Sequence, residues 1–196
     1  AHKRKIPVII DAAWGGHFGF HPALPRHPMQ MGADAFVTSI HKALPGYSAS
    51  AIAVARIGLL DRARLEQGFE STHTTSPAGA PLASIDGVRA LLQIRGEELL
   101  ERLLSNVSDF RNHLTSEFGS EILLKPTDFA VNRFDPTKLV LRANILGADG
   151  IEIEKELIAE GVRVEMADRD TVVFLATLAD DADTFAQLAT TLIPIL

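Results

Sequence analysis

Two largely apolar runs near the beginning of the sequence predict buried β-strands. The run 6–10 ends at Asp11, and the run 35–38 ends at Ser39. Continuous apolar runs of this length are typical of parallel strands that are covered on both faces. Residues 50–55 form a third run of small apolar residues and predict another strand. We therefore expect an α/β arrangement with polar residues at the carboxyl ends of its strands.

The middle of the sequence carries apolar residues at helical spacing. Ser76 followed by Pro77 is a favourable helix start, because serine caps helices and proline fits the first helical position. The helical pattern then continues for about 40 residues, and Gly96 is predicted to interrupt it. We interpret residues 77–118 as a helical connector. It completes a first domain, residues 1–118, and leads into a second.

From Gly119 onward the pattern alternates between strands and helices. Three segments have the composition of strands: 138–143, 162–166 and 171–178. Asp149 is placed to cap one helix, and Asp180 or Asp181 is placed to cap the last one. This pattern predicts a small α+β domain over residues 119–196.

The composition is that of an ordinary globular protein, with 46% hydrophobic and 22% charged residues in a chain of 196. The net charge of -6 offers no basic surface for nucleic acid or an anionic membrane. The absence of cysteine excludes disulfides and thiolate metal sites, and it is compatible with a reducing cytoplasm. No apolar stretch approaches the roughly 20 residues of a membrane span. We therefore expect a cytoplasmic protein without nucleic-acid or membrane partners.

Lys42 stands in the segment Ser39-Ile40-His41-Lys42, directly after the second predicted strand. An ammonium at the end of a buried strand loses hydration, which is costly unless the amine has a function. A Schiff base with an aldehyde cofactor is one such function, because it neutralises the amine covalently. The alternative is a lysine whose head simply reaches solvent. For a lone lysine this alternative is the better interpretation.

Asp11 and its neighbours change that balance. A pyridine cofactor needs a carboxylate near its ring nitrogen, a small residue against its ring and a donor for its phenolic oxygen. Asp11, Ala13 and Trp14 offer these groups, while Ser39 and His41 offer donors for a phosphate. Each residue alone has another explanation, since aspartate often caps strand ends and tryptophan is more often part of a core or a lid. A carboxylate and an amine at adjacent strand ends together favour a cofactor.

Two histidines have the spacing of a metal-ligand pair on a helix, His17 and His21. Gly19 and Pro22 break helices, so we expect no metal site there. The glycines of this loop do not match a dinucleotide-binding fingerprint.

A set of motifs extends over nearly the whole chain in one order. In sequence these are residues 11–22 (DAAWGGHFGFHP), Gly32-Ala33-Asp34, Ser39-Ile40-His41-Lys42, His73-Thr74-Thr75-Ser76-Pro77, Asp135-Pro136-Thr137-Lys138-Leu139 and residues 161–168 (GVRVEMAD). Together they resemble the major domain of the bacterial ornithine/lysine/arginine decarboxylases. These are pyridoxal-phosphate enzymes of the aspartate-aminotransferase fold (fold type I). The resemblance implies the C-terminal part of such a large domain, followed by a small α+β C-terminal domain.

The resemblance also implies a role for each candidate residue. Lys42 is expected to form the Schiff base with pyridoxal 5'-phosphate, and Asp11 to pair with the pyridine nitrogen. The remaining implied contacts are those of Ala13 with the ring, Trp14 with the phenolic oxygen, and Ser39 and His41 with the phosphate.

In this fold the active site lies at a dimer interface, so the resemblance implies a homodimer or a higher homo-oligomer. Thr75 is in a loop similar to the one that reaches the phosphate of the neighbouring subunit. Residues 78–80 depart from the family pattern, because they are Ala-Gly-Ala where an aromatic residue is usual. This departure weakens the case for substrate contacts from the loop.

A complete enzyme of this fold begins well before the strand that ends at Asp11. The earlier half supplies the loop that cradles the phosphate and the ring that stacks on the cofactor. We therefore expect this chain to be a fragment, inactive alone, with a separate N-terminal chain as one explanation.

The function implied by the resemblance is decarboxylation of lysine, ornithine or arginine to an amine and carbon dioxide. Two alternatives remain open. Asp11 and Lys42 would serve an aminotransferase or another lyase of the same fold equally well. A non-catalytic or split-enzyme subunit that needs another chain is the second alternative.

Overall fold

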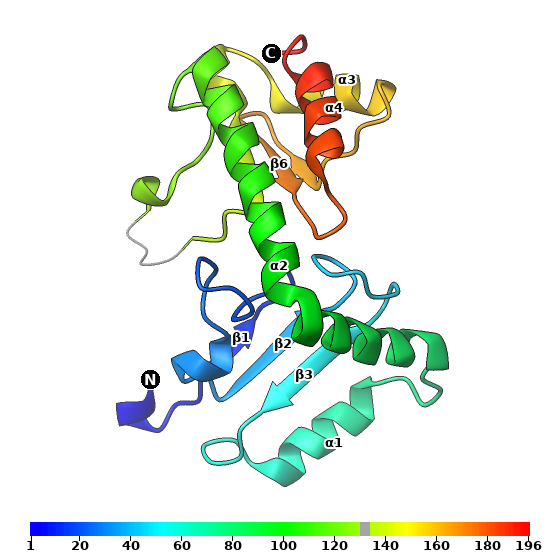
Figure 1. Cartoon of the computed structure of the whole chain (residues 1–196). Helices are drawn as coiled ribbons and strands as arrows, with labels where there is room; N and C mark the ends of the chain where they lie inside the picture. The colour runs from blue at the N-terminus through cyan, green and yellow to red at the C-terminus, as the bar shows by residue number, and fades with distance from the viewer. Residues whose placement is uncertain (130–133) are drawn as a thin grey trace. The chain divides into compact units, whose positions relative to one another are not determined.

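The computed structural model describes residues 1–129 and 134–196 and contains two compact units, Ala1–Gly96 and Glu97–Leu196 (Figure 1). Each unit has its own β-sheet. The long helix α2, Gly79–Phe118, contributes its first part to the first unit and its remainder to the second. The chain is α/β, as the apolar pattern predicted. Among the helices that the structure describes, none is long and apolar enough to cross a lipid bilayer.

A three-stranded sheet in the order β1-β2-β3 forms the centre of the first unit (Figure 1). β1 (Ile9–Asp11) runs parallel to β2 (Ala35–Ser39), and β3 (Ala51–Ala55) pairs antiparallel with β2. All three predicted strands are therefore confirmed, although β1 begins only at Ile9. In the parallel register Asp11 lies beside Val37 of β2, so both strands end at the same edge of the sheet.

The two faces of this sheet differ in how well they are covered. Phe36 and Val54 lie opposite each other on one face and line a pocket of about 240 Å³ with Val88 and Leu92 of α2. Phe36, Val88 and Leu92 belong to the apolar core of the unit, whereas Val54 is 39% exposed. Alternate residues point to the other face, where Val37 is 43% exposed.

Helix α2 corrects two details of the sequence prediction. It begins at Gly79 rather than Pro77. Pro81 therefore lies in the first turn, where its missing N–H group is not needed. Gly96 lies within the helix and does not interrupt it. Apolar residues are buried on both sides of Gly96, and their packing outweighs the cost of about 1 kcal/mol that a helical glycine carries.

Helix α1, Arg62–Thr72, precedes α2 and has no buried residue. Its N-cap is Asp61, whose carboxylate accepts the Arg64 N–H at 2.9 Å. The loop between α1 and α2 is exposed as well.

The second unit contains an antiparallel sheet in the order β4-β6-β5. Its strands are β4 (Lys138–Arg142), β5 (Met166–Ala167) and β6 (Thr171–Leu175), and its further helices are α3 (Gly150–Ala159) and α4 (Ala182–Leu192). The predicted caps are confirmed, because Asp149 accepts the Ile151 N–H and Asp181 accepts the Thr184 N–H. The strand predicted over 162–166 is shorter than expected and begins only at Met166.

The core of the second unit includes the second part of α2. Leu100, Leu103, Val107 and Leu114 recur at helical spacing and are at most 3% exposed. The domain boundary after residue 118 stays a prediction, as does the identity of residues 119–196 as a separate small domain.

Candidate active site

Except for Thr75, the predicted site residues lie at the ends of β1 and β2 or directly after them. β1 ends at Asp11 and β2 at Ser39. Main-chain pairing continues past β1, because the Ala12 N–H donates to the Val37 carbonyl at 2.9 Å and the Ser39 N–H donates to the Ala13 carbonyl at 3.3 Å. These bonds hold the loop that follows Asp11 beside the end of β2.

Two further contacts fasten this loop to β2. The Thr38 hydroxyl donates to the Ala12 carbonyl at 2.8 Å. Gly16 approaches β2 so closely that a Cβ atom would lie 3.1 Å from the Ser39 carbonyl and 3.0 Å from Leu44 Cδ1. Glycine permits this approach because it has no side chain. The sequence analysis does not single out Thr38, for which a polar residue within an apolar strand is the available signal.

The Asp11 side chain is exposed, and one of its oxygens bonds within its own loop. Oδ1 accepts the Ala13 N–H at 3.0 Å, which is the local geometry of an Asx turn. Oδ2 has no hydrogen-bond partner in the part of the chain that the structure describes. The carboxylate is therefore oriented by the backbone and keeps an acceptor free.

Lys42 lies in a tight loop directly after β2. The Ile40 N–H donates to the Ser50 carbonyl at 2.9 Å, and the Gly46 N–H donates to the Ile40 carbonyl at 3.2 Å. A Cβ atom on Gly46 would lie 2.7 Å from Ile40 Cγ2 and 2.8 Å from Ser50 Oγ, so the closure of the loop requires glycine. Within residues 1–129 and 134–196 the Lys42 ammonium has no hydrogen-bond or ion-pair partner.

The exposure of Lys42 corrects one step of the sequence argument. From the sequence, the Lys42 ammonium is expected to lose hydration at a buried strand end. In the structure the Lys42 side chain is exposed. A desolvation cost is therefore no argument that its amine has a function. The remaining evidence for a functional role of Lys42 is its position in the loop after β2, whose end lies beside the loop that follows β1.

His41 is half-buried and its ring is oriented by one hydrogen bond. Nδ1 lies 2.8 Å from the Ser50 carbonyl oxygen. Because a carbonyl only accepts, Nδ1 carries a proton and donates. Nε2 is then an acceptor in the neutral ring, and it donates to an anion only when the ring is protonated.

Ser39, Ala13 and Trp14 are half-buried at the same edge of the sheet. The Ser39 hydroxyl and the Trp14 indole N–H have no hydrogen-bond partner among the described residues. Thr75 is not brought into this group by any hydrogen bond that the described chain contains. It lies in the exposed loop between α1 and α2.

The uncommitted groups fit pyridoxal phosphate. They comprise a carboxylate oxygen, an amine, an indole N–H and a hydroxyl, all on two loops that main-chain hydrogen bonds hold together. A pyridine ring with an aldehyde, a phenolic oxygen and a phosphate has a counterpart for each of them.

The motif at residues 135–138 has a structural explanation in the second unit. Lys138 Nζ lies 2.9 Å from Asp135 Oδ2 and donates to Thr137 Oγ1 at 3.0 Å. Burial lowers the pKa of Lys138, and the Asp135 carboxylate opposes this effect. Arg111 of α2 donates to the carbonyls of Leu124 and Lys138, each at 3.2 Å, so these side chains fasten β4 to the helix.

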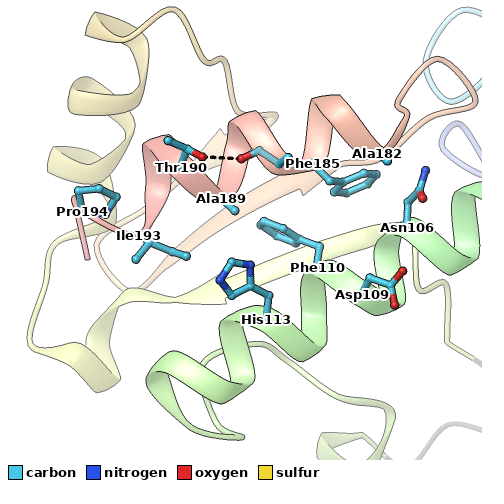
Figure 2. A pocket seen from close by; sticks show the side chains of 11 residues that line it. Asn106, Asp109, Phe110, His113, Ala182, Phe185, Ala189, Thr190, Ile193 and Pro194 are labelled. Carbon is cyan, nitrogen blue, oxygen red and sulfur yellow. Dashed lines mark hydrogen bonds between the residues drawn. The ribbon is translucent and has the colours of Figure 1, made fainter.

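A groove of about 550 Å³ lies between the second part of α2 and α4 (Figure 2). Phe110 and Phe185 form its apolar floor, with ring centroids 5.6 Å apart. Asp109 and His113 lie along its α2 side (Figure 2). None of the predicted site residues lines this groove.

Comparison with solved structures identifies the fold. Lysine decarboxylase A from Pseudomonas aeruginosa superposes with a TM-score of 0.78 at 19% identity, over 96% of this chain and 32% of that protein. An ornithine aminotransferase from Plasmodium yoelii superposes with a TM-score of 0.62 at 15% identity, over 98% of this chain and 48% of that protein. The chain therefore has the fold that decarboxylases and aminotransferases of fold type I share.

Sequence comparison identifies the family. Residues 1–184 match the sequence model of the family described as Orn/Lys/Arg decarboxylase, major domain. An arginine decarboxylase from Bacillus subtilis is 34% identical over 199 residues, which cover 97% of this chain and 40% of that protein. The chain therefore belongs to the Orn/Lys/Arg decarboxylase family, and it spans about 40% of the length of this relative.

Proposed function

We propose that this chain carries the cofactor site of a pyridoxal-phosphate-dependent decarboxylase that converts lysine, ornithine or arginine to an amine and carbon dioxide. The observation that supports this most is the pairing of two strand ends, which brings the Asp11 loop beside the residues that lead to Lys42. Membership of the family supports the same reaction class.

Pyridoxal phosphate, when bound, supplies an aldehyde that combines with amines and a ring that accepts the electrons of the bond being broken. Lys42 Nζ would be the amine that holds the aldehyde, and as a free amine it would be the base and acid beside the reacting carbon. Asp11 Oδ2 holds a proton on the ring nitrogen. Its other oxygen stays on the Ala13 N–H and fixes this orientation.

The remaining contacts orient the cofactor. Ala13 packs against the ring, and the Trp14 indole N–H donates to the phenolic oxygen. The Ser39 hydroxyl donates to the phosphate. His41 contributes a donor there only in its protonated form, because its Nδ1 proton is already committed to Ser50. These are weaker contacts than the covalent one, and they determine orientation more than affinity.

The assembly that we propose is a homodimer or higher homo-oligomer in the cytoplasm, in which Thr75 contacts the phosphate bound to a neighbouring copy. Thr75 lies in an exposed loop, which leaves it accessible to a second chain. A separate chain that supplies the earlier half of the large domain is a further proposed partner. In its absence we expect little activity.

The reaction is tested by incubating the protein, with pyridoxal phosphate, with lysine, ornithine and arginine in turn. Carbon dioxide and the corresponding amine are the expected products with at least one of them. Keto acid without carbon dioxide would identify an aminotransferase, the alternative that the likeness to ornithine aminotransferase supports. The assay is run on the chain alone and with a chain that supplies the rest of the family's length. Activity only in the second case would identify a split enzyme.

A further inference from the structure

The loop after β1 is attached to β2 through three successive residues of that strand. The Val37 carbonyl accepts the Ala12 N–H, and the Ser39 N–H donates to the Ala13 carbonyl. Between them, the Thr38 hydroxyl donates to the Ala12 carbonyl at 2.8 Å. Thr38 is only 6% exposed, so its hydroxyl is shielded from water and depends on a protein partner. The loop is therefore attached by a buried side-chain contact as well as by main-chain bonds.

The Thr38 contact reaches Asp11 through a single peptide group. The Ala12 carbonyl and the Ala13 N–H belong to the same planar peptide and point in opposite directions. Thr38 donates to the carbonyl, and the N–H donates to Asp11 Oδ1 at 3.0 Å. Because the peptide is rigid, a donor that holds its oxygen also directs its N–H. Successive hydrogen bonds polarise one another, so the Thr38 bond also makes the Ala13 N–H a stronger donor.

We propose that Thr38 is a positioning residue of the cofactor site, which orients the Asp11 carboxylate through the peptide between Ala12 and Ala13. This inference deepens the proposed function and rests on it, because Asp11 Oδ2 is the oxygen assigned there to the pyridine nitrogen. Oδ1 is held by the Ala13 N–H, so the direction of that N–H determines where Oδ2 points. The same peptide leads directly to Ala13 and Trp14, which are assigned to the ring and the phenolic oxygen.

A purely structural role for Thr38 is the alternative, and the contacts of the Ala12 carbonyl separate the two roles. This carbonyl also accepts the Gly15 N–H at 2.7 Å. Removing the Thr38 hydroxyl therefore leaves no orphaned acceptor at Ala12, and an orphaned buried acceptor is a usual source of a large loss of stability. Valine has a branched shape similar to that of threonine and no hydroxyl. Thr38→Val should therefore disturb the orientation of the peptide more than the stability of the fold.

NMR of the protein without cofactor tests the link from Thr38 to Asp11. In Thr38→Val we expect the Ala13 amide proton to shift upfield and to exchange faster with solvent, because its bond to Asp11 is weaker. Thr38→Ser keeps the hydroxyl and should keep the wild-type signal. Thr171→Val is the matched control, because Thr171 begins β6 in the other unit and also bonds through its hydroxyl, to Asp168 at 3.0 Å. It should leave the Ala13 signal unchanged.

Cofactor binding by the assembled enzyme tests the link from Asp11 to the cofactor. Thr38→Val is expected to weaken binding of pyridoxal phosphate and to lower kcat, each roughly threefold to tenfold, as for the loss of one neutral hydrogen bond. With isotopically labelled pyridoxal phosphate, the NMR signal of the ring nitrogen should move toward that of the unprotonated ring. Thr38→Ser should recover each property, and Thr38→Ala, which also lacks the hydroxyl, should repeat the loss. Melting temperatures of all variants check the fold.

Three outcomes would overturn the proposal, and they can be distinguished. An Ala13 amide signal that does not change in Thr38→Val would exclude the link from Thr38 to Asp11. A changed amide signal, with cofactor binding and kcat equal to those of the wild type, would exclude the link from Asp11 to the cofactor. A wild type that binds no pyridoxal phosphate, although its Ala13 signal responds to Thr38→Val, would show that the proposed function itself is wrong.

Discussion

Lys42 owes its position to main-chain hydrogen bonds, and Asp11 adds to such bonds a single contact of its carboxylate. The Asp11 carboxylate accepts one backbone N–H, and the loop of Lys42 is closed by the backbone of Ile40 and Gly46. A side chain that holds nothing else in place can be changed without loss of the fold. These residues are therefore suited to tests that separate chemistry from stability.

Asp11→Asn is expected to keep the fold and lose the reaction. The amide oxygen still accepts the Ala13 N–H, but it no longer holds a proton on the ring nitrogen. We expect an unchanged melting temperature and a decrease of roughly a hundredfold or more in kcat, as for the loss of other electrostatic stabilisers. Steady-state decarboxylation by the assembled enzyme measures this. Activity equal to that of the wild type would contradict the role given to Asp11.

The contacts of Asp34 predict that the free energy of unfolding depends on pH. Its Oδ2 accepts the Val8 N–H at 2.8 Å and lies 2.7 Å from His2 Nε2. The bond from Val8 first, and then His2, lower the pKa of Asp34 below its ordinary value of 3.8. A lowered folded pKa means that the carboxylate stabilises the fold fully above the ordinary value, and that this contribution is lost as the pH falls through the folded value.

Urea unfolding of the wild type and of Asp34→Asn, between about pH 5 and about pH 2.5, measures this contribution. The wild type should be more stable at the higher pH, and the difference should shrink as the pH falls. Asp109→Asn, an exposed aspartate, is the control and should follow the wild type throughout. A difference that stays constant over this range would assign the effect to something other than the charge of Asp34.

At the scale of the elements, the loop that carries Lys42 depends on one glycine. Gly46→Ala would bring a Cβ atom within 3 Å of the side chains of Ile40 and Ser50. We expect a destabilisation of about 1–3 kcal/mol and weaker binding of pyridoxal phosphate. Gly58→Ala is the control, since no heavy atom lies within 4 Å of its Cβ position. Denaturant unfolding and cofactor titration of both variants should separate them, and equal stability would contradict the close packing.

The elements themselves were largely predictable from the sequence. Apolar runs closed by polar residues located all three strands of the first unit, and the caps Asp149 and Asp181 followed from residue type. The start of α2 was not predictable from Ser76 and Pro77, because Pro81 competes for the first turn. The exposure of α1 could not be predicted either, since Leu65 and Phe69 have the spacing of a buried face.

The residue types of the candidate site could be predicted from the sequence, but the burial and the hydrogen bonds of these residues could not. Asp11 and Lys42 could be predicted as one site because each follows the end of one of two adjacent strands. The assumption that Lys42 is desolvated was wrong, because burial depends on packing that no local pattern contains. The Nδ1 hydrogen bond of His41 with Ser50 could not be foreseen, since it depends on the closure of the loop.

At the scale of the whole molecule, the division into two units predicts that a destabilising substitution in one unit leaves the stability of the other unchanged. Leu141 on β4 is fully buried in the second unit, and Leu141→Ala should cost about 2–5 kcal/mol there. Hydrogen exchange should then accelerate in β4 and β6 while the amides of β2 keep their protection. Equal loss of protection in β2 would show that the chain unfolds as one cooperative unit.

Borohydride reduction of the protein with bound pyridoxal phosphate, followed by peptide mass spectrometry, tests the central claim most directly. The chain has six lysines, so the position of the label is informative. The account predicts a phosphopyridoxyl group on the peptide that contains Lys42, well above the labelling of the other five, and its loss in Lys42→Arg. Label distributed over the other lysines, with Lys42 unmodified, would contradict it.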